Sequence, residues 1–107
     1  MILPNLIIAG VPKSGTTFLF QLLRNHPEIC TSLIKETRSF KRDISGKCII
    51  DLEKYSNFFS HHKNEKIILE ASPGYFYGGK EMASFIGKTL KNVKIINLKR
   101  PLLVILL

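Results

Sequence analysis

A glycine-bearing loop between an apolar run and a helical pattern constrains this chain more than any other feature. Residues 6–9, Leu-Ile-Ile-Ala, form a short apolar run rich in β-branched residues, as expected of a buried parallel strand. Gly-Val-Pro-Lys-Ser-Gly-Thr-Thr follows at positions 10–17, and helical spacing begins directly after it. Strand, glycine loop and helix in this order are the context that a phosphate-binding loop requires.

The residue types in the loop explain why phosphate is the expected ligand. Gly10 and Gly15 let the backbone turn tightly, so that successive N–H groups can point at phosphate oxygens. A helix that starts near Thr16 adds the positive end of its dipole, which stabilises an anionic charge by about 0.3–1 kcal/mol. The alternative is a glycine turn between a strand and a helix that binds nothing.

Helical spacing predicts a helix over residues 16–25, with Phe18 among the core residues, and His26-Pro27 ends it because the residue before a proline avoids helical geometry. Residues 28–47 are polar and irregular, so we expect a long surface loop with one short strand near 29–33. Asp51 can cap a helix that runs to about His61.

The second half of the chain alternates strands and helices. We expect a strand at 67–69, a turn at 72–74, a helix over 80–90 and a further strand at 93–98. Alternating strands and helices predict an α/β domain with three layers and a parallel sheet. At 107 residues the chain is one domain or a piece of one.

The loop departs from the pattern of nucleotide triphosphatases, G-x-x-x-x-G-K-[ST]. Both glycines match and Thr17 takes the hydroxyl position, but Thr16 stands where the pattern has lysine, and the lysine is at position 13. This change argues against ATP or GTP hydrolysis, in which that lysine contacts the β and γ phosphates. An ATP-dependent kinase with a phosphate-binding loop (P-loop) remains an alternative.

Pro-Lys-Ser-Gly-Thr-Thr at positions 12–17 resembles the 5′-phosphosulfate loop of sulfotransferases that use 3′-phosphoadenosine 5′-phosphosulfate (PAPS). The resemblance implies a P-loop NTPase-like fold and PAPS as the co-substrate, with no metal. It implies that Lys13 contacts the leaving phosphate and the sulfuryl group. The residues implied to hold the 5′-phosphate are Lys13, Ser14, Gly15, Thr16 and Thr17.

Two further segments carry the resemblance. Lys35-Glu36 followed by Phe40 resembles the K-E-P-H-F-F segment of carbohydrate sulfotransferases related to the heparan sulfate enzymes, although Thr37 and Arg38 replace its proline and histidine. That segment implies Glu36 as the general base; the alternative is a solvated carboxylate paired with its basic neighbours. The sequence Glu-Ala-Ser-Pro-Gly-Tyr at 70–75 resembles E-x-[ST]-P-x-Y, which shapes the acceptor cleft. The residues implied to bind the acceptor are Lys35, Arg38, Ser72 and Tyr75, although Tyr75 could equally pack under the turn.

The fourth segment matches the family in part. Residues 94–101 resemble the strand that leads into L-R-[ND]-P-x-x-R-x-x-S, whose first arginine and serine bind the 3′-phosphate. Lys99 takes the arginine's place and Arg100 follows it, so both are candidate cofactor-binding residues. Val104 and Leu107 stand where the second arginine and the serine belong. We therefore expect residues 1–107 to be the N-terminal part of a sulfotransferase domain, incomplete at the C-terminus through truncation or a frameshift. A non-catalytic nucleotide-binding remnant is a further alternative.

Composition limits the partners. Sixteen Lys and Arg against eight Asp and Glu give a formal charge of +8, which favours anionic ligands. The basic residues are spread without a dense block, so we expect a basic nucleotide pocket rather than an arm that binds nucleic acid. The resemblance implies a small-molecule or carbohydrate acceptor beside the nucleotide. The two cysteines match no metal motif. Apolar runs are shorter than the ~20 residues of a membrane-spanning helix, so we expect a cytoplasmic protein without a transmembrane segment.

Overall fold

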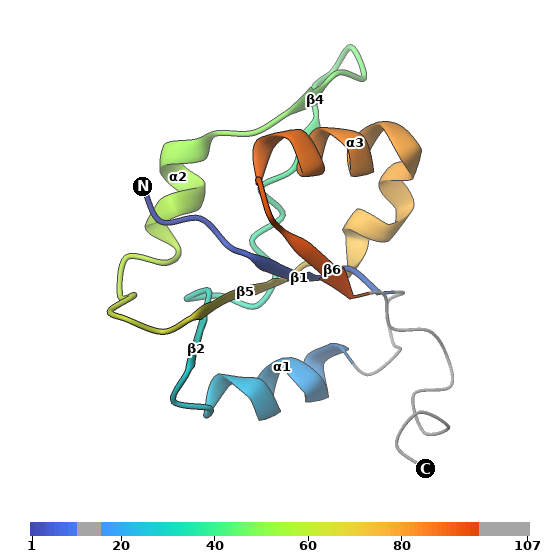
Figure 1. Ribbon diagram of the computed structural model, residues 1–107. Helices are drawn as coiled ribbons and strands as arrows, with labels where there is room; N and C mark the ends of the chain where they lie inside the picture. The colour runs from blue at the N-terminus through green and yellow to red at the C-terminus, as the bar shows by residue number, and fades with distance from the viewer. Residues whose placement is uncertain (11–15, 97–107) are drawn as a thin grey trace.

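The computed structural model describes residues 1–10 and 16–96, and a four-stranded parallel sheet lies at its centre (Figure 1). The strand order is β2-β5-β1-β6, and all three neighbouring pairs are parallel. The strands are β1 (Leu6–Ile8), β2 (Ile29–Thr31), β5 (Ile67–Ala71) and β6 (Lys94–Ile96).

Helices cover both faces of this sheet. Helix α1 (Thr16–Arg24) lies on one face, whereas α2 (Leu52–Asn57) and α3 (Gly79–Thr89) lie on the other, as Figure 1 shows. A 3-10 helix, η1 (Pro73–Gly78), joins β5 to α3. The prediction of a three-layer α/β fold with a parallel sheet is confirmed.

The strands alternate their side chains between two cores, as a pleated sheet requires. Ile7 packs with the aromatic and aliphatic side chains of the α2 and α3 layer, while Ile8 packs with Leu69 and Phe20 on the α1 side. Each of these side chains is at most 1% exposed: Ile7, Ile8, Leu69 and Phe20. Burial of both faces explains why β1 consists of apolar residues throughout.

The segment expected as a long loop contains more structure than predicted. The short strand near 29–33 is present as β2, but a two-stranded antiparallel hairpin also forms from β3 (Lys41–Arg42) and β4 (Cys48–Ile49). Asp43 closes its turn, because its carboxylate accepts hydrogen bonds from the amides of Ser45 and Lys47, both at 2.9 Å. Side-chain bonds of Asp to nearby amides stabilise turns where hydrophobic spacing gives no signal.

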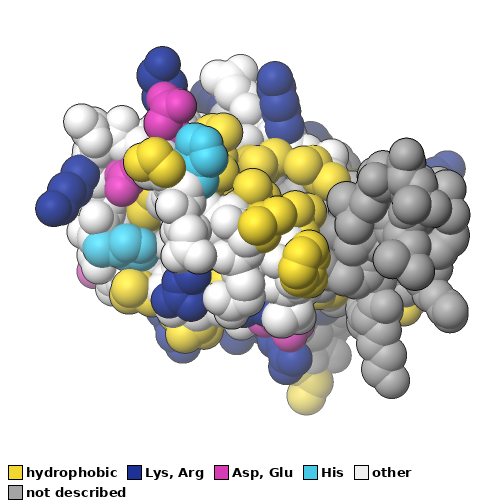
Figure 2. Space-filling view, turned by 90° about the horizontal axis from the view of Figure 1, so that it is seen from below, with side chains coloured by type: hydrophobic (Ala, Val, Ile, Leu, Met, Phe, Trp, Pro, Cys, Tyr) yellow, Lys and Arg dark blue, Asp and Glu magenta, His cyan; other side chains and the backbone are white. Residues whose placement is uncertain are grey.

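The prediction that Phe18 belongs to the core is wrong. Phe18 and Leu22 are each 60% exposed, whereas Phe20 is 1% exposed and faces the sheet. Helix α1 has two neighbouring apolar stripes, and the stripe of Leu19, Phe20 and Leu23 is the one that faces β1 and β5. In Figure 2, which views the molecule from the α1 side, hydrophobic side chains accordingly gather on the surface.

Helix α2 also differs from its prediction in length. Asp51 caps it as expected, with its carboxylate accepting from the Lys54 amide at 3.1 Å, but the helix ends at Asn57 instead of near His61. A series of turns carries the chain from there to β5. Among the helices of residues 1–10 and 16–96, none has the length and apolar character needed to cross a bilayer.

Candidate functional site

The sheet has a switch point between its two central strands. The chain leaves β1 toward α1 on one face and leaves β5 toward η1 and α3 on the opposite face. The two strand ends lie side by side, because Ile8 is in register with Ala71 and the Ser72 amide donates to the Ile8 carbonyl at 3.1 Å. Open α/β sheets bind ligands in the crevice at such a point, outside the carboxyl ends of the strands.

On the β1 side, the described residues frame the predicted phosphate loop. Ala9 is held between its neighbours by a hydrogen bond from its amide to the Ile96 carbonyl at 2.9 Å, and Gly10 is buried. Helix α1 begins at Thr16, has no acidic residue in its first turn and carries Arg24 in its last. This charge distribution leaves the positive end of the helix dipole free for an anion.

Several predicted binding residues lie outside the described part of the chain: Lys13, Ser14, Gly15, Lys99 and Arg100. Thr16 is described only through its backbone, as the first residue of α1. Thr17 lies in the first turn of α1 and is exposed. The roles of all seven in cofactor binding therefore stay predictions.

The segment that contains Glu36 is a short charged cluster. The Glu36 carboxylate lies 3.8 Å from Lys35 Nζ and 3.7 Å from Arg38 Nη2, and its side chain is 36% exposed. Pairs at this exposure stabilise a structure by about 0–1 kcal/mol, so Glu36 can exchange these partners for a ligand at little cost. The predicted base and the predicted acceptor-binding residues Lys35 and Arg38 therefore lie together.

Ser72 and Tyr75, the other two predicted acceptor-binding residues, are buried and contact the same segment. Ser72 Oγ accepts from the Arg38 amide at 3.3 Å. Tyr75 Oη accepts from the amides of Ser39 at 3.0 Å and Phe40 at 3.3 Å. Ser72 and Tyr75 are 1% and 9% exposed, so they contact the backbone of the Glu36 segment from beneath.

These contacts place the Glu36 segment at the edge of the sheet where β1 ends. The Arg38 amide donates to Ser72 Oγ, and the Ser72 amide donates to the Ile8 carbonyl at the end of β1. Ser72, directly after β5, therefore bridges the backbone of Arg38 and the end of β1. Ile8 and Arg38, which are 30 residues apart in the sequence, are thus linked through Ser72 at the switch point.

Glu70 has a structural role that the sequence reasoning missed. It lies in β5, is 0% exposed, and accepts hydrogen bonds from Tyr55 Oη and Ser72 Oγ, both at 2.5 Å. Tyr75 Oη donates to it at 3.1–3.2 Å, and Thr37 Oγ1 donates as well. The sequence did contain a signal for this role: a glutamate inside an apolar strand, two residues before a serine. A buried carboxylate requires hydrogen-bond partners, and a nearby hydroxyl can supply one.

Burial decides the ionisation of this cluster. Loss of hydration raises the pKa of Glu70, while the hydrogen bonds from Ser72, Thr37, Tyr55 and Tyr75 oppose the rise. Burial and the charge of Glu70 raise the pKa of both Tyr55 and Tyr75 above that of a solvated tyrosine. Both phenols therefore stay protonated and act as hydrogen-bond donors.

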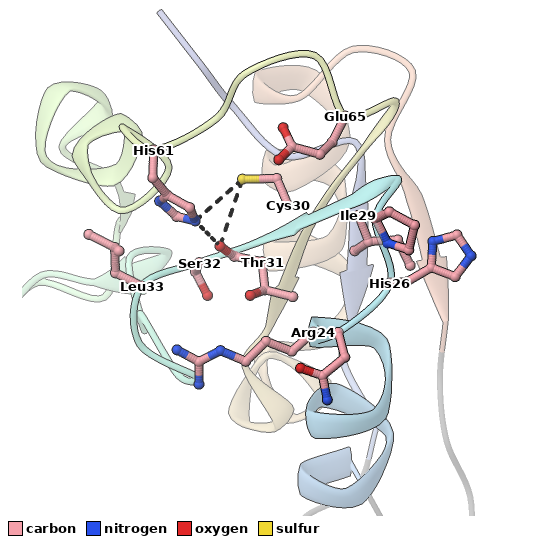
Figure 3. A pocket seen from close by; sticks show the side chains of 11 residues that line it. Arg24, His26, Ile29, Cys30, Thr31, Ser32, Leu33, His61 and Glu65 are labelled. Carbon is pink, nitrogen blue, oxygen red and sulfur yellow. Dashed lines mark hydrogen bonds between the residues drawn. The ribbon is translucent and has the colours of Figure 1, made fainter.

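A separate cavity of about 500 Å³ lies along the outer edge of β2 (Figure 3). His61 Nε2 lies 2.8 Å from the Thr31 carbonyl and 3.5 Å from Cys30 Sγ. With its Nε2 proton donated to the carbonyl, His61 cannot accept the proton of the thiol at that nitrogen. Burial and, second, the charge of Glu65 raise the pKa of Cys30, which favours the neutral thiol over the nucleophilic thiolate. Among residues 1–10 and 16–96, no predicted site residue lines this cavity.

The comparisons with known proteins agree with the fold and identify the family. The model of the sulfotransferase domain family matches residues 3–102, and the chain therefore belongs to the sulfotransferase family. Over 101 residues it is 37% identical to the membrane-associated sulfotransferase kil1 of Dictyostelium discoideum, a match that covers 92% of this chain and 20% of that protein.

A solved structure shows the same fold. The crystal structure of a sulfotransferase from Alicyclobacillus acidocaldarius superposes with a TM-score of 0.73 at 24% identity, covering 91% of this chain and 44% of that one. The P-loop NTPase-like α/β fold predicted from the sequence is thereby confirmed. The chain spans a fifth of the length of its Dictyostelium relative and less than half of the bacterial sulfotransferase.

Proposed function

We propose that this chain carries the donor-binding loop and the proton acceptor of a PAPS-dependent sulfotransferase, which transfers a sulfuryl group to a hydroxyl or amine acceptor. One observation carries the proposal: the Glu36 segment and the end of β1 are joined at the carboxyl edge of the sheet through Ser72. A donor bound at the loop after β1 and an acceptor beside Glu36 would then meet in one crevice.

The described residues suit an anionic donor. The first-turn amides of α1 have no carbonyl partner within the helix, and no acidic side chain competes for them. Lys13 and Ser14 precede this turn in the sequence and would add a positive charge and a hydroxyl. Lys99 and Arg100 are the candidates to bind the 3′-phosphate. They follow β6 in the sequence, and the last described residue of β6, Ile96, accepts a hydrogen bond from the Ala9 amide.

The proposed transfer is an in-line displacement. A bond forms between the acceptor oxygen or nitrogen and sulfur, the bond from sulfur to the 5′-phosphate oxygen breaks, and the acceptor proton moves to the Glu36 carboxylate. Lys13 would stabilise the charge that develops on the leaving phosphate. A positioned general base typically contributes 10²–10⁴-fold in rate, and the weak ion pairs of Glu36 leave it free to take this role.

Nucleotide binding provides the direct test. Isothermal titration should show tighter binding of adenosine 3′,5′-bisphosphate than of ATP with Mg²⁺, and Lys13→Ala should abolish the binding. Lys91→Ala is the matched control, because this exposed lysine precedes β6 at the opposite edge of the sheet and its loss changes the net charge equally. Tighter binding of ATP would favour the kinase alternative, and equal affinity of wild type and Lys13→Ala would remove Lys13 from the site.

A further inference from the structure

We propose that Glu70 is a positioning residue: its buried carboxylate holds residues 37–40 in place and, through them, orients Glu36 toward the crevice. The proposal rests on the proposed function, in which Glu36 accepts the proton of the acceptor. Glu70 itself is 0% exposed and cannot touch a substrate, so its effect has to pass through the segment it anchors.

Three hydroxyl groups connect Glu70 to this segment. Thr37 Oγ1 donates to Glu70 directly. Ser72 Oγ donates to Glu70 at 2.5 Å and accepts from the Arg38 amide at 3.3 Å. Tyr75 Oη donates to Glu70 and accepts from the Ser39 and Phe40 amides. Four consecutive residues are thus tied to one carboxylate.

The direction of these hydrogen bonds depends on the ionised carboxylate. A hydroxyl has one hydrogen to donate, and a carboxylate offers only acceptor sites. While Ser72 and Tyr75 give their hydrogens to Glu70, their lone pairs face the backbone amides of the segment. A glutamine has the same shape, but its NH₂ group must donate where Glu70 accepts. Whichever oxygen the NH₂ group replaces, the Tyr75 hydroxyl loses one of its two acceptor oxygens, and the hydrogen bonds it accepts from the Ser39 and Phe40 amides weaken.

Backbone geometry gives independent support. Arg38 has φ = 51°, in the left-handed region that costs a residue with a side chain roughly 1–2 kcal/mol. Such conformations persist where surrounding bonds fix them. The amide of Arg38 is bound by Ser72, and its guanidinium pairs with Glu36. The anchored and strained residue is therefore also a neighbour of the proposed base.

Two tyrosines form a matched pair for the test. Tyr55 and Tyr75 both donate to Glu70, both are buried, and both meet the Phe40 ring edge to face, with centroids 5.4 and 5.6 Å away. Only Tyr75 accepts hydrogen bonds from amides of the segment. Tyr75→Phe and Tyr55→Phe therefore remove the same group from the same cluster, but only Tyr75→Phe releases the segment.

Native-state hydrogen exchange at pH 8, which favours the ionised carboxylate, would measure the effect on the amides of Ser39 and Phe40. We expect exchange about tenfold faster in Glu70→Gln and Tyr75→Phe, the factor for loss of one hydrogen bond, and near wild-type exchange in Tyr55→Phe. The amide of Ile68, which donates to Asn5 Oδ1 outside this cluster, is the reference, and the acceleration at Ser39 and Phe40 is measured relative to it.

Equal acceleration in both tyrosine variants, or none in Tyr75→Phe, would overturn the proposal. If Glu70→Gln does not fold, the two tyrosine variants decide by themselves. Binding of adenosine 3′,5′-bisphosphate should be unchanged in Tyr75→Phe, and any sulfuryl transfer should lose kcat without a change in the donor KM. If the exchange pattern is observed but the protein binds no nucleotide, the anchoring role of Glu70 is supported and the proposed function is refuted.

Discussion

Replacement of Gly78 by alanine should destabilise the connection from β5 to α3 that places Tyr75 beneath the Glu36 segment. A Cβ atom at Gly78 would lie 2.6 Å from Met82 Cβ and 2.8 Å from Met82 Cγ. Carbon atoms in contact are about 3.5–4.0 Å apart, so the backbone would have to shift by about 1 Å. Met82 cannot rotate its Cβ away, because that atom is fixed to the α3 backbone, and the side chain is 4% exposed.

The cost of this change follows from steric overlap alone. Gly78 has φ = −74° and ψ = −13°, a conformation that alanine adopts without strain. Overpacking of a core costs typically about 1–3 kcal/mol, which corresponds to a fall in Tm of roughly 5–20 °C in a protein of this size. Urea unfolding followed by circular dichroism would measure the loss as a lower midpoint at an unchanged slope.

Gly87→Ala is the matched control, because Gly87 lies in α3, the helix that directly follows Gly78. A Cβ at Gly87 would have no atom within 4 Å, and the residue is exposed, so alanine should stabilise α3 by about 0.5–1 kcal/mol. The two substitutions add the same methyl group and should change stability in opposite directions. A Gly78→Ala protein as stable as wild type would refute the close packing of η1 against α3.

Three further outcomes are expected from urea unfolding. Asp51→Ala should cost about 1 kcal/mol, since it removes the cap that accepts from the Lys54 amide. Phe20→Ala should cost about 3–5 kcal/mol, whereas Phe18→Ala on the exposed stripe should stay within about 0.5 kcal/mol; equal losses would contradict the orientation of α1. Burial raises the pKa of Glu70, so above a pH of roughly 4.3 the folded protein keeps a proton that the unfolded chain has released. The free energy of unfolding should therefore fall as the pH rises from there through the pKa of Glu70 in the folded protein. Glu70→Gln should flatten this dependence on pH.

The order of elements could be predicted because each main strand carries a local signal. The apolar run before Gly10 and the run that begins at Ile67 are buried on both faces, so their residues are apolar without alternation. The hairpin of β3 and β4 gave no such signal, because Lys41 and Arg42 are exposed and the turn is held by side-chain bonds of Asp43. Structure that depends on polar contacts leaves little trace in hydrophobic spacing.

The orientation of α1 shows a second limit. Helical spacing identifies residues that share a stripe, but it does not identify the neighbour that each stripe faces. The stripe of Phe18 and Leu22 matches the pattern as well as that of Leu19 and Leu23. The packing of Phe20 against Ile8 and Leu69, with Leu19 and Leu23 beside it, distinguishes them. That contact joins residues from three separate elements and follows from the tertiary fold alone.

The site was partly predictable for a related reason. Motif spacing singled out Glu36, Ser72 and Tyr75 individually, and the structure shows that the last two contact the backbone around the first. A motif identifies which side chains are present, but burial decides which of them can contact a ligand and which have a structural role. Ser72 and Tyr75 are buried and donate their hydroxyl hydrogens to Glu70. Glu36 and Arg38, by contrast, have charged groups that reach solvent. Substitution of Glu36 should therefore affect proton transfer directly, whereas substitution of Glu70 should act through the order of residues 37–40.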